Sequence, residues 1–259
     1  MNFATFRQPS ILTIAGVFLL AAPAWAQSPI RQVNVVHIKA DRGSDFEAAV
    51  KQFNEVYSKL PNARSRVVYR SLSGPNEYLV VTPFAKWSEV DEGPLGAAFK
   101  PNAELTVINN RIRNCVESTT TVFDQLLPEL SLPRAPVPPA MLRIARERVR
   151  PDKTKEYEAV IKDVLKPAYT KAALPSLTVR RVRFGAPTNE YYISTRLSTW
   201  ADLDGEPKLR KSMGEEAYQQ MVAKFVSMTL TRELNVFRYR PDLSFNSNPA
   251  PTTTTAAAR

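Results

Sequence analysis

The stretch Pro75–Pro94, PNEYLVVTPFAKWSEVDEGP, returns 113 residues later as Thr188–Pro207, TNEYYISTRLSTWADLDGEP. Seven of the twenty aligned positions are identical, among them an Asn-Glu-Tyr run and the tryptophans Trp87 and Trp200. Such a match indicates an internal repeat, and a repeat has to be recognised before a fold is assigned. We therefore compared the order of predicted elements around the two segments.

Around the first segment, the sequence predicts strands over residues 33–40, 64–71, 77–84 and 118–126, and helices from residue 44 to the Pro61-Asn62 stop and over 103–116. β-Branched and apolar residues mark the strands, and Ser44 with Glu47 makes a capping box for the first helix. The order β-α-β-β-α-β is that of a ferredoxin-like unit, with two helices on one face of a four-stranded antiparallel sheet.

The same order surrounds the second segment. It predicts strands over residues 141–150, 177–184, 191–197 and 231–239, and helices over 155–165 and 215–228. Four prolines within residues 132–139 predict a stiff, extended connector. The predicted organisation is a first repeat at 31–131, a Pro-rich linker at 132–140 and a second repeat at 141–244.

A ferredoxin-like unit covers only one face of its sheet, so the other face needs a partner. Two joined units can cover each other. We therefore expect an α+β fold in which two tandem ferredoxin-like repeats form an intrachain pseudo-dimeric α/β barrel. The chain would be a monomer that imitates a dimer, or would assemble further into a higher homo-oligomer.

The two ends of the chain differ in composition from the repeats. Arg7, an apolar run over residues 11–22 and the Ala24-Trp25-Ala26 pattern predict a signal peptide at residues 1–26. Because the apolar run is shorter than the roughly 20 residues that span a bilayer, cleavage is favoured over a membrane anchor. We expect a periplasmic or secreted protein that does not span the membrane, with a disordered tail at 245–259.

The formal charge of +10 is concentrated in the second repeat. The first repeat has 12 Lys and Arg against 12 Asp and Glu, and the second has 20 against 13. A basic half can attract nucleic acid, anionic lipid or an acidic small molecule. Predicted export and the lack of a recognition motif argue against nucleic acid. An acidic or aromatic small molecule, or simply a solvated basic surface, remains.

Side-chain alternation gathers basic and polar residues on single faces of three second-repeat strands. These residues are Arg146, Arg148 and Arg150 in the first strand, Arg181 and Arg183 in the second, and Tyr192, Ser194 and Arg196 in the third. An arginine that points into a barrel needs a bound anion or a carboxylate, for which Glu147 is a candidate. The functional interpretation is a pocket for an acidic or aromatic small molecule. The structural interpretation is a solvated face or internal salt bridges.

Of four other residues, three have both a functional and a structural interpretation, and one has a structural interpretation alone. Trp87 and Trp200 could line a ligand cavity or plug the core, as large aromatic side chains commonly do. His37, the only histidine, could act as an acid or base, or be structural. Cys115, the only cysteine, can form no internal disulfide and is predicted to be a small buried hydrophobe. No nucleophilic triad, phosphate loop or metal-ligand cluster can be assembled, so neither a metal nor a cofactor is predicted.

The strand order, the Asn-Glu-Tyr start of the third strand and the tryptophan after it resemble the dimeric α/β barrel superfamily, which includes antibiotic-biosynthesis-monooxygenase-like and NIPSNAP-type domains. Cofactor-free monooxygenases of this type use Asn, Trp and Arg or Tyr around an aromatic substrate, and Trp87 and Trp200 match that motif. Haem-degrading relatives need a strand-one Asn, where this chain has Val36 and Glu147, and a helical His, which it lacks. The resemblance therefore does not extend to haem degradation, or to chlorite-dismutase-like or dye-peroxidase-like chemistry.

Three functions remain open, because this scaffold carries many. The first is an exported barrel that binds a small acidic or aromatic ligand through its basic second repeat, with little or no catalysis. The second is a cofactor-independent monooxygenase acting on an aromatic substrate. The third is an envelope interaction scaffold without a small ligand. An enclosed cavity reached by Trp200, Tyr192 and Arg196 would favour the first two, and a packed apolar barrel the third.

Overall fold

The structure, a computed structural model, describes residues 28–60, 63–93, 95, 103–133 and 137–245. The predicted signal peptide, the tail beyond residue 245 and the middle of the predicted linker lie outside these residues. None of the helices within the described ranges is long and apolar enough to cross a membrane.

The first half follows the predicted order of elements. Its elements are β1 (Ile30–Ile38), α2 (Gly43–Tyr57), β2 (Val67–Ser71), β3 (Glu77–Phe84), η1 (Trp87–Glu89), α3 (Ala103–Cys115), β4 (Val116–Leu126) and η2 (Pro128–Leu130). The third strand begins and ends as predicted. The first strand begins three residues earlier than predicted, and the second strand begins three residues later.

The second half repeats this order with a more elaborate helical layer. Its elements are β5 (Met141–Val149), η3 (Pro151–Lys153), α4 (Thr154–Val160), the π-helical turn η4 (Ile161–Leu165), α5 (Lys166–Lys171), β6 (Thr178–Phe184), β7 (Glu190–Leu197), η5 (Trp200–Leu203), α6 (Lys208–Met213), α7 (Glu215–Met228), β8 (Thr229–Tyr239) and η6 (Pro241–Leu243). The π-helical turn precedes Pro167, whose nitrogen cannot donate to a carbonyl of the preceding turn. The short helix α6 was not predicted.

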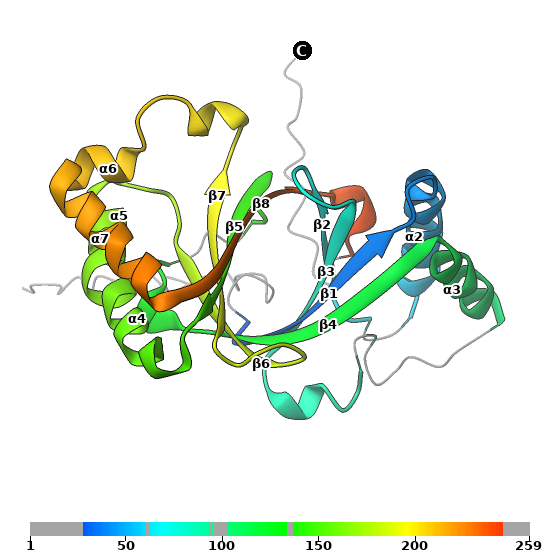
Figure 1. The fold of residues 1–259 in the computed structure, drawn as a ribbon. Coiled ribbons are helices and arrows are strands. Elements are labelled where there is room, and N and C mark those ends of the chain that lie inside the picture. The colour runs from blue at the N-terminus through cyan, green and yellow to red at the C-terminus, as the bar shows by residue number, and fades with distance from the viewer. Residues whose placement is uncertain (1–27, 61–62, 94, 96–102, 134–136, 246–259) are drawn as a thin grey trace, which may run out of the picture.

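The eight strands close into one antiparallel barrel in the order β1-β3-β2-β8-β5-β7-β6-β4. The strands of each half are neighbours, and the halves join at two seams, β2 with β8 and β4 with β6. Figure 1 shows α2 and α3 on one side of the barrel and α4 to α7 on the other. The prediction of a mixed α and β fold built on a closed barrel is confirmed.

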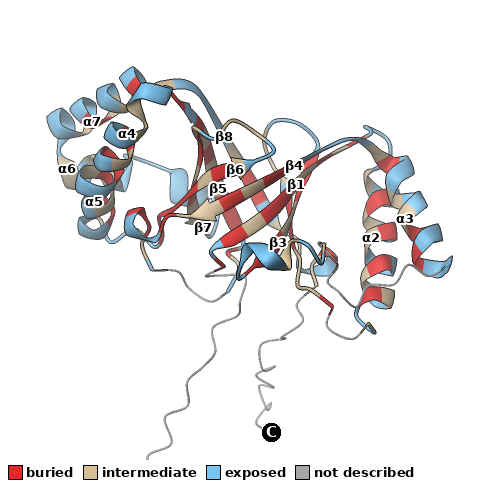
Figure 2. Ribbon diagram, turned by 90° about the horizontal axis from the view of Figure 1, so that it is seen from below, coloured by how far each residue is buried: buried red, intermediate tan, exposed pale blue. Residues whose placement is uncertain are grey.

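Alternate residues of each strand therefore face either the barrel interior or a helical layer. The exposed surfaces lie mostly on the outer faces of the helices, and buried residues gather where helices and strands meet (Figure 2). In the first half, Tyr78 of β3 donates to Glu47 of α2 with an Oη–Oε1 distance of 2.6 Å, and Arg70 of β2 reaches the same Oε1 at 3.3 Å. The Tyr78 ring packs on Phe46 with centroids 4.8 Å apart.

The second half contains the same arrangement. Tyr191 donates to Glu158 Oε1 at 2.6 Å, Arg181 reaches that oxygen at 3.3 Å, and the Tyr191 and Tyr157 rings lie 4.9 Å apart. Each trio ties the first helix of its half to the second and third strands. Burial and the hydrogen bond to Glu158 raise the pKa of Tyr191, so the hydroxyl stays protonated and donates.

One seam of the barrel is held by a buried ionic cluster. Asp124 of β4 accepts from Arg31 of β1 (Nη2–Oδ2 2.6 Å) and from Arg180 of β6 (Nε–Oδ1 2.5 Å). Asp124 is fully buried and Arg180 is 1% exposed. Arg180 also donates to the backbone carbonyls of Ser28 and Pro29. The charged groups are thus paired and hydrogen-bonded, which a buried charge requires.

The opposite seam is apolar and aromatic. Residues at equivalent places in the strand pairing differ between the seams. Leu142 of β5 lies opposite Phe237 of β8, as Arg31 of β1 lies opposite Asp124 of β4. Tyr69 has the place on β2 that Arg180 has on β6. Leu142, Phe237 and Tyr69 belong to one buried cluster inside the barrel. The two seams therefore have different chemistry, although they join equivalent strands.

We expect Asp124→Asn to lower the free energy of unfolding by about 3 kcal/mol, because the substitution leaves two arginines beside a neutral amide. Urea denaturation measures the effect. Asp242→Asn is the matched control, since Asp242 pairs with Lys51 and Arg240 at the surface and such pairs contribute about 1 kcal/mol or less. Equal losses in the two variants would contradict the assigned role of the cluster.

The cluster also predicts a pH dependence. Burial alone would raise the pKa of Asp124, but Arg180 and Arg31 outweigh it and hold that pKa below its ordinary value. Asp124 therefore contributes stability that is present above about pH 4 and is lost as the pH falls through its lower folded pKa. The stability gap between wild type and Asp124→Asn should narrow in acid. A gap that stays constant down to about pH 2 would contradict this.

Candidate functional site

The barrel interior contains a cavity of about 260 Å³. Four of the predicted site residues line it: His37 of β1, Arg146 of β5, and Tyr192 and Ser194 of β7. Most of the wall is apolar and consists of Val33, Val35, Leu79, Val81, Val122, Leu142, Ile144 and Phe237. The interior is therefore neither a fully packed core nor a wholly basic pocket.

The arginine in this cavity is already paired. Arg146 donates to the Glu190 carboxylate from Nε (2.6 Å) and Nη2 (3.3 Å), and its Nη1 lies 3.9 Å from Glu233 Oε2. Glu190 is buried, which makes this bidentate pair a fixed part of the barrel. Burial alone would lower the pKa of Arg146, but the hydrogen bond to Glu190 together with the charges of Glu190, Glu233 and Tyr192 raises it. An acidic ligand would have to compete with two carboxylates here.

The other predicted arginines do not join this site. Arg196 lines two other cavities, of about 40 Å³ and about 830 Å³, and donates to the Val137 carbonyl at 2.9 Å. Arg148 is exposed at the outer end of β5. The residues that sequence spacing placed in one cluster are thus spread along the barrel axis.

The side-chain orientation predicted for β6 is wrong. Arg181 contacts Glu158 in the helical layer, and Arg183 donates to Gln125 of β4 (2.8 Å). It is Arg180 that points inward, to Asp124. Arg180 and Arg181 are adjacent and equally polar, so alternation of residue type gave no indication of which one faces the interior.

Glu147 was also assigned to the wrong face. Its carboxylate accepts from the Tyr157 hydroxyl (2.6 Å) and from Arg232 Nε (3.0 Å), both on the helix-facing side of the sheet. Burial, followed by the charge of Glu147, raises the pKa of Tyr157 well above its ordinary value. Glu147 therefore cannot serve the interior arginines.

Neither repeated tryptophan plugs the core. Trp87 is 38% exposed and Trp200 is 47% exposed. The Trp87 ring meets Phe184 of β6 edge-on at 5.3 Å and lies 6.3 Å from Phe123 of β4, so it covers the ionic seam from outside. Both residues begin short 3-10 helices that follow β3 and β7. Cys115 is buried, as predicted.

Sequence reasoning missed the larger cavity between the helices and the sheet of the first half. Its volume is about 620 Å³. Apolar side chains make most of its wall: Val36, Phe46, Val50, Phe53, Val68, Val80, Leu95, Leu105, Ile112, Val116 and Leu243. It separates two buried clusters, one around Phe46 and one around Phe53. Protein interiors rarely leave such space empty.

Two arginines, Arg66 and Arg113, line this helix–sheet cavity, and Arg66 is the one held between aromatic rings. Its Nη2 donates to Asn54 Oδ1 (2.7 Å), and its guanidinium lies 4.6 Å and 4.7 Å from the ring centroids of Phe53 and Tyr57. It has no acidic partner among the described residues, and its Nε makes no hydrogen bond there. Burial lowers the pKa of Arg66 to about 10, which still leaves the group charged at neutral pH.

Two further features make the cavity receptive to polar groups. The Thr82 hydroxyl, on a residue 1% exposed, has no hydrogen-bond partner within the described ranges. Asn34, Asn109 and Asn110 also line the space. The described residues that line it include no Asp, Glu, His, Lys, Cys or Tyr, so they can bind a ligand through two arginines and amides but offer no side-chain general base.

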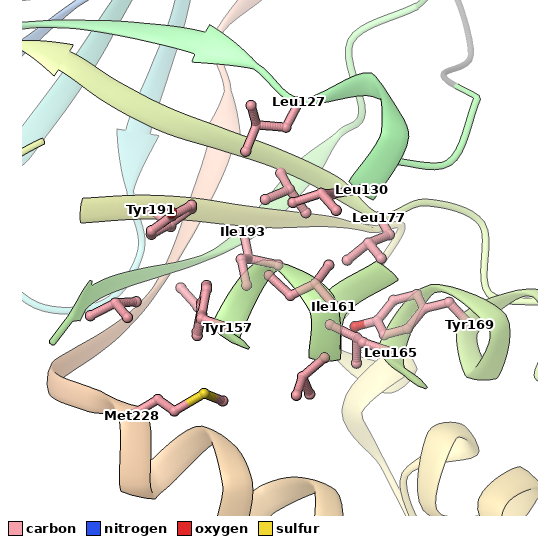
Figure 3. Close-up of a cluster of buried hydrophobic side chains, with 14 of the residues drawn as sticks. Leu127, Leu130, Tyr157, Ile161, Leu165, Tyr169, Leu177, Tyr191, Ile193 and Met228 are labelled. Atoms are coloured by element: carbon pink, nitrogen blue, oxygen red, sulfur yellow. The ribbon is translucent and has the colours of Figure 1, made fainter. Parts of the chain in front are cut away.

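The equivalent space between the helices and the sheet of the second half is smaller. Its cavity measures about 110 Å³, and a single cluster of 15 buried residues replaces the two clusters of the first half (Figure 3). A further cavity of about 830 Å³ adjoins it toward η5 and α6 and shares Arg143, Tyr169 and Tyr218 with it.

The strand pairing shows which residues correspond in the two halves. Ile193 pairs with Val179 as Val80 pairs with Val68, so Ile193 takes the place of Val80. Two residues before each pairing partner, Leu177 takes the place of Arg66. Bulkier and apolar residues therefore narrow in one half the space that the other leaves open.

The described part of the chain contains no group of three or more His, Cys, Asp or Glu side chains that could hold a metal ion. No protein-family model matches the chain, and no curated protein matches it in sequence.

Solved structures do match the fold. An "anthrone oxidase-like protein" gives a TM-score of 0.58 at 12% identity and covers 88% of this chain and 96% of its own. A provisionally named monooxygenase from Lactobacillus acidophilus NCFM gives 0.55 at 8% identity, with 85% and 97% covered, and another from Fusobacterium nucleatum gives 0.54 at 10%, with 82% and 92% covered. The chain thus shares the fold of these three structures, in agreement with the closed α/β barrel expected from the sequence.

Proposed function

We propose that this protein binds an apolar, aromatic small molecule with an anionic or hydrogen-bond-accepting group in the helix–sheet cavity of the first half. Arg66, a cation in the wall of this cavity without an acidic partner among the described residues, is the observation that carries the proposal. The sequence also indicated an acidic or aromatic ligand, but it indicated a site in the basic second half, whereas the site proposed here lies in the neutral first half. Export of the protein remains a prediction from its N-terminal sequence.

The shape of the cavity supports an aromatic ligand. Binding pockets for small molecules are mostly apolar, with a few fixed polar groups that set orientation, and commonly span about 300–1,000 Å³. The cavity is within that range at about 620 Å³. Phe46 and Phe53 supply aromatic walls, and Val50 and Val80 leave the space that larger side chains fill in the second half.

The charge of Arg66 supports an anionic or accepting group. The rings of Phe53 and Tyr57 hold the guanidinium in place by cation–π contact, and Asn54 occupies only one of its nitrogens. A guanidinium has five N–H donors in a fixed fork. The remaining donors can meet a carboxylate, sulfonate or phenolate, and charge-assisted hydrogen bonds of this kind are about twice as strong as neutral ones.

Two fluorescent probes test the proposal. 1-Anilinonaphthalene-8-sulfonate is an aromatic anion, and N-phenyl-1-naphthylamine is its analogue without the sulfonate. Arg66→Leu, which introduces the residue found at the equivalent place in the second half, should weaken binding of the anion by about tenfold and that of the neutral probe by less than about twofold. Fluorescence titration measures both affinities.

A second variant checks the location. Val80→Phe should weaken both probes, because the larger ring occupies cavity volume rather than removing charge. Arg238→Leu, an exposed strand position on β8, is the control and should change neither affinity. Equal weakening of both probes by Arg66→Leu, or no effect of Val80→Phe, would contradict binding at this site.

A cofactor-independent oxygenase is the second candidate function. The fold neighbours named as monooxygenases and as anthrone oxidase-like favour it, and Asn34 with Arg66 supplies the amide and guanidinium side chains that such enzymes place around an aromatic substrate. With anthrone, the reaction would convert the ring CH₂ to a carbonyl. One atom of O₂ would enter that carbonyl, and the other would leave as water with the two hydrogens.

Oxygen uptake separates the two functions. An oxygenase should consume one O₂ per anthraquinone formed, faster than the uncatalysed oxidation, and Asn34→Ala should lower kcat by at least about tenfold. Val80→Phe should lower the rate as well, through loss of substrate space. A protein that binds the sulfonate probe but shows no uptake above the uncatalysed rate is a binding protein only.

We also infer that the two halves are copies of one ferredoxin-like unit. The inference is supported by the shared order of elements, and by the Tyr–Glu–Arg trios centred on Glu47 and Glu158, whose distances agree within 0.1 Å. On this view, the helix–sheet cavity stayed large in the first copy and became small in the second, whose buried core is continuous.

A further inference from the structure

A buried carboxylate in the barrel cavity has a histidine nearby but receives no hydrogen bond from a described residue. Glu77 of β3 is 8% exposed and lines the cavity of about 260 Å³. The nearest basic atom recorded for it is Nε2 of His37, at 3.7 Å from Oε2, which is too long for a hydrogen bond. No described residue donates a hydrogen bond to this carboxylate, whereas buried carboxylates normally receive several.

The equivalent residue of the other half shows what is missing. Glu190 begins β7 as Glu77 begins β3, and it receives two hydrogen bonds from Arg146. Glu233 also lies near that guanidinium. Three carboxylates, those of Glu77, Glu190 and Glu233, therefore lie around Arg146 and His37 at this end of the barrel. Glu233 is 61% exposed, and Arg148 beyond it is exposed as well. The surplus charge is negative, so the cavity favours a cation.

The rest of the cavity limits the size and nature of that cation. Val35, Leu79 and Ile144 make an apolar wall beside Glu77. An apolar cavity of about 150 Å³ is large enough for a benzene-sized molecule, so about 260 Å³ accommodates a phenyl ring with a short amine side chain. A bare metal ion would leave most of this wall unused.

We propose that the barrel cavity binds a small primary amine with a hydrocarbon part about the size of a phenyl ring, and that Glu77 receives its ammonium group. The ammonium supplies the hydrogen bonds that the carboxylate lacks, and the apolar wall covers the hydrocarbon. Burial raises the pKa of Glu77 despite the opposing influence of His37 and Arg146, and a bound ammonium would favour the charged form and lower that pKa. This site is separate from the helix–sheet cavity and does not depend on the function proposed for it.

Isothermal titration calorimetry with three matched probes tests the proposal: 2-phenylethylamine, 2-phenylethanol and phenylacetate. The amine should bind at least about tenfold more tightly than the alcohol or the acid. Glu77→Gln should remove that preference and leave the fold intact, since no described hydrogen bond to the carboxylate is lost. Ile144→Phe, which fills the cavity, should weaken the amine without altering charge.

Arg66→Leu is the control for the other cavity and should leave amine affinity within about twofold of wild type. An amine that binds no more tightly than the alcohol would overturn the proposal. So would an amine preference that survives Glu77→Gln, or an amine that fails to bind at concentrations up to about 10 mM.

Discussion

The barrel depends on the ionic contact of Arg31 and Arg180 with Asp124, because this contact joins strands of both halves at the seam where β4 meets β6. A buried ionic cluster contributes little net stability compared with well-packed apolar residues, yet losing one partner is costly. We infer that the cluster instead determines which strands pair at each seam. The second seam presents Phe237 and Tyr69 at the corresponding places, so a closure that exchanged the two seams would bury unpaired charges against aromatic rings.

The two helical layers that cover the closed barrel are packed differently. In the second half, Tyr157, Tyr169 and Ile161 belong to a continuous core, and the π-helical turn widens the helix that carries it. The first half gives up that packing and keeps two smaller clusters around an open space. Binding sites are commonly built at the expense of packing, and the rest of the structure must supply the stability. A chain with two similar halves can place stability in one and a site in the other.

Much of the architecture was readable from the sequence, because it rests on local patterns. The Asn-Glu-Tyr start of the third strand and the alternation around Tyr192 each depend on a few neighbouring residues. The capping box predicted at Ser44 and Glu47 is wrong: α2 begins at Gly43 without a side-chain cap, and the Glu47 carboxylate accepts from Tyr78 instead. The orientation of Arg180 and Arg181 was not readable, since two adjacent arginines carry no apolar-polar alternation. Nor was the helix–sheet cavity, because an unfilled volume depends on which side chains from distant strands and helices fail to meet.

The same strands separate the two cavities. Val35 and Leu79 face the barrel cavity, while Val36 and Val80, their neighbours in sequence, face the helix–sheet cavity. Because successive side chains of a strand point to opposite faces, a slip of one residue in β1 or β3 would exchange the two linings. The contact between Arg31 and Asp124 fixes β1 against β4 and opposes such a slip. The interaction that closes the barrel therefore also determines which side chains each cavity receives.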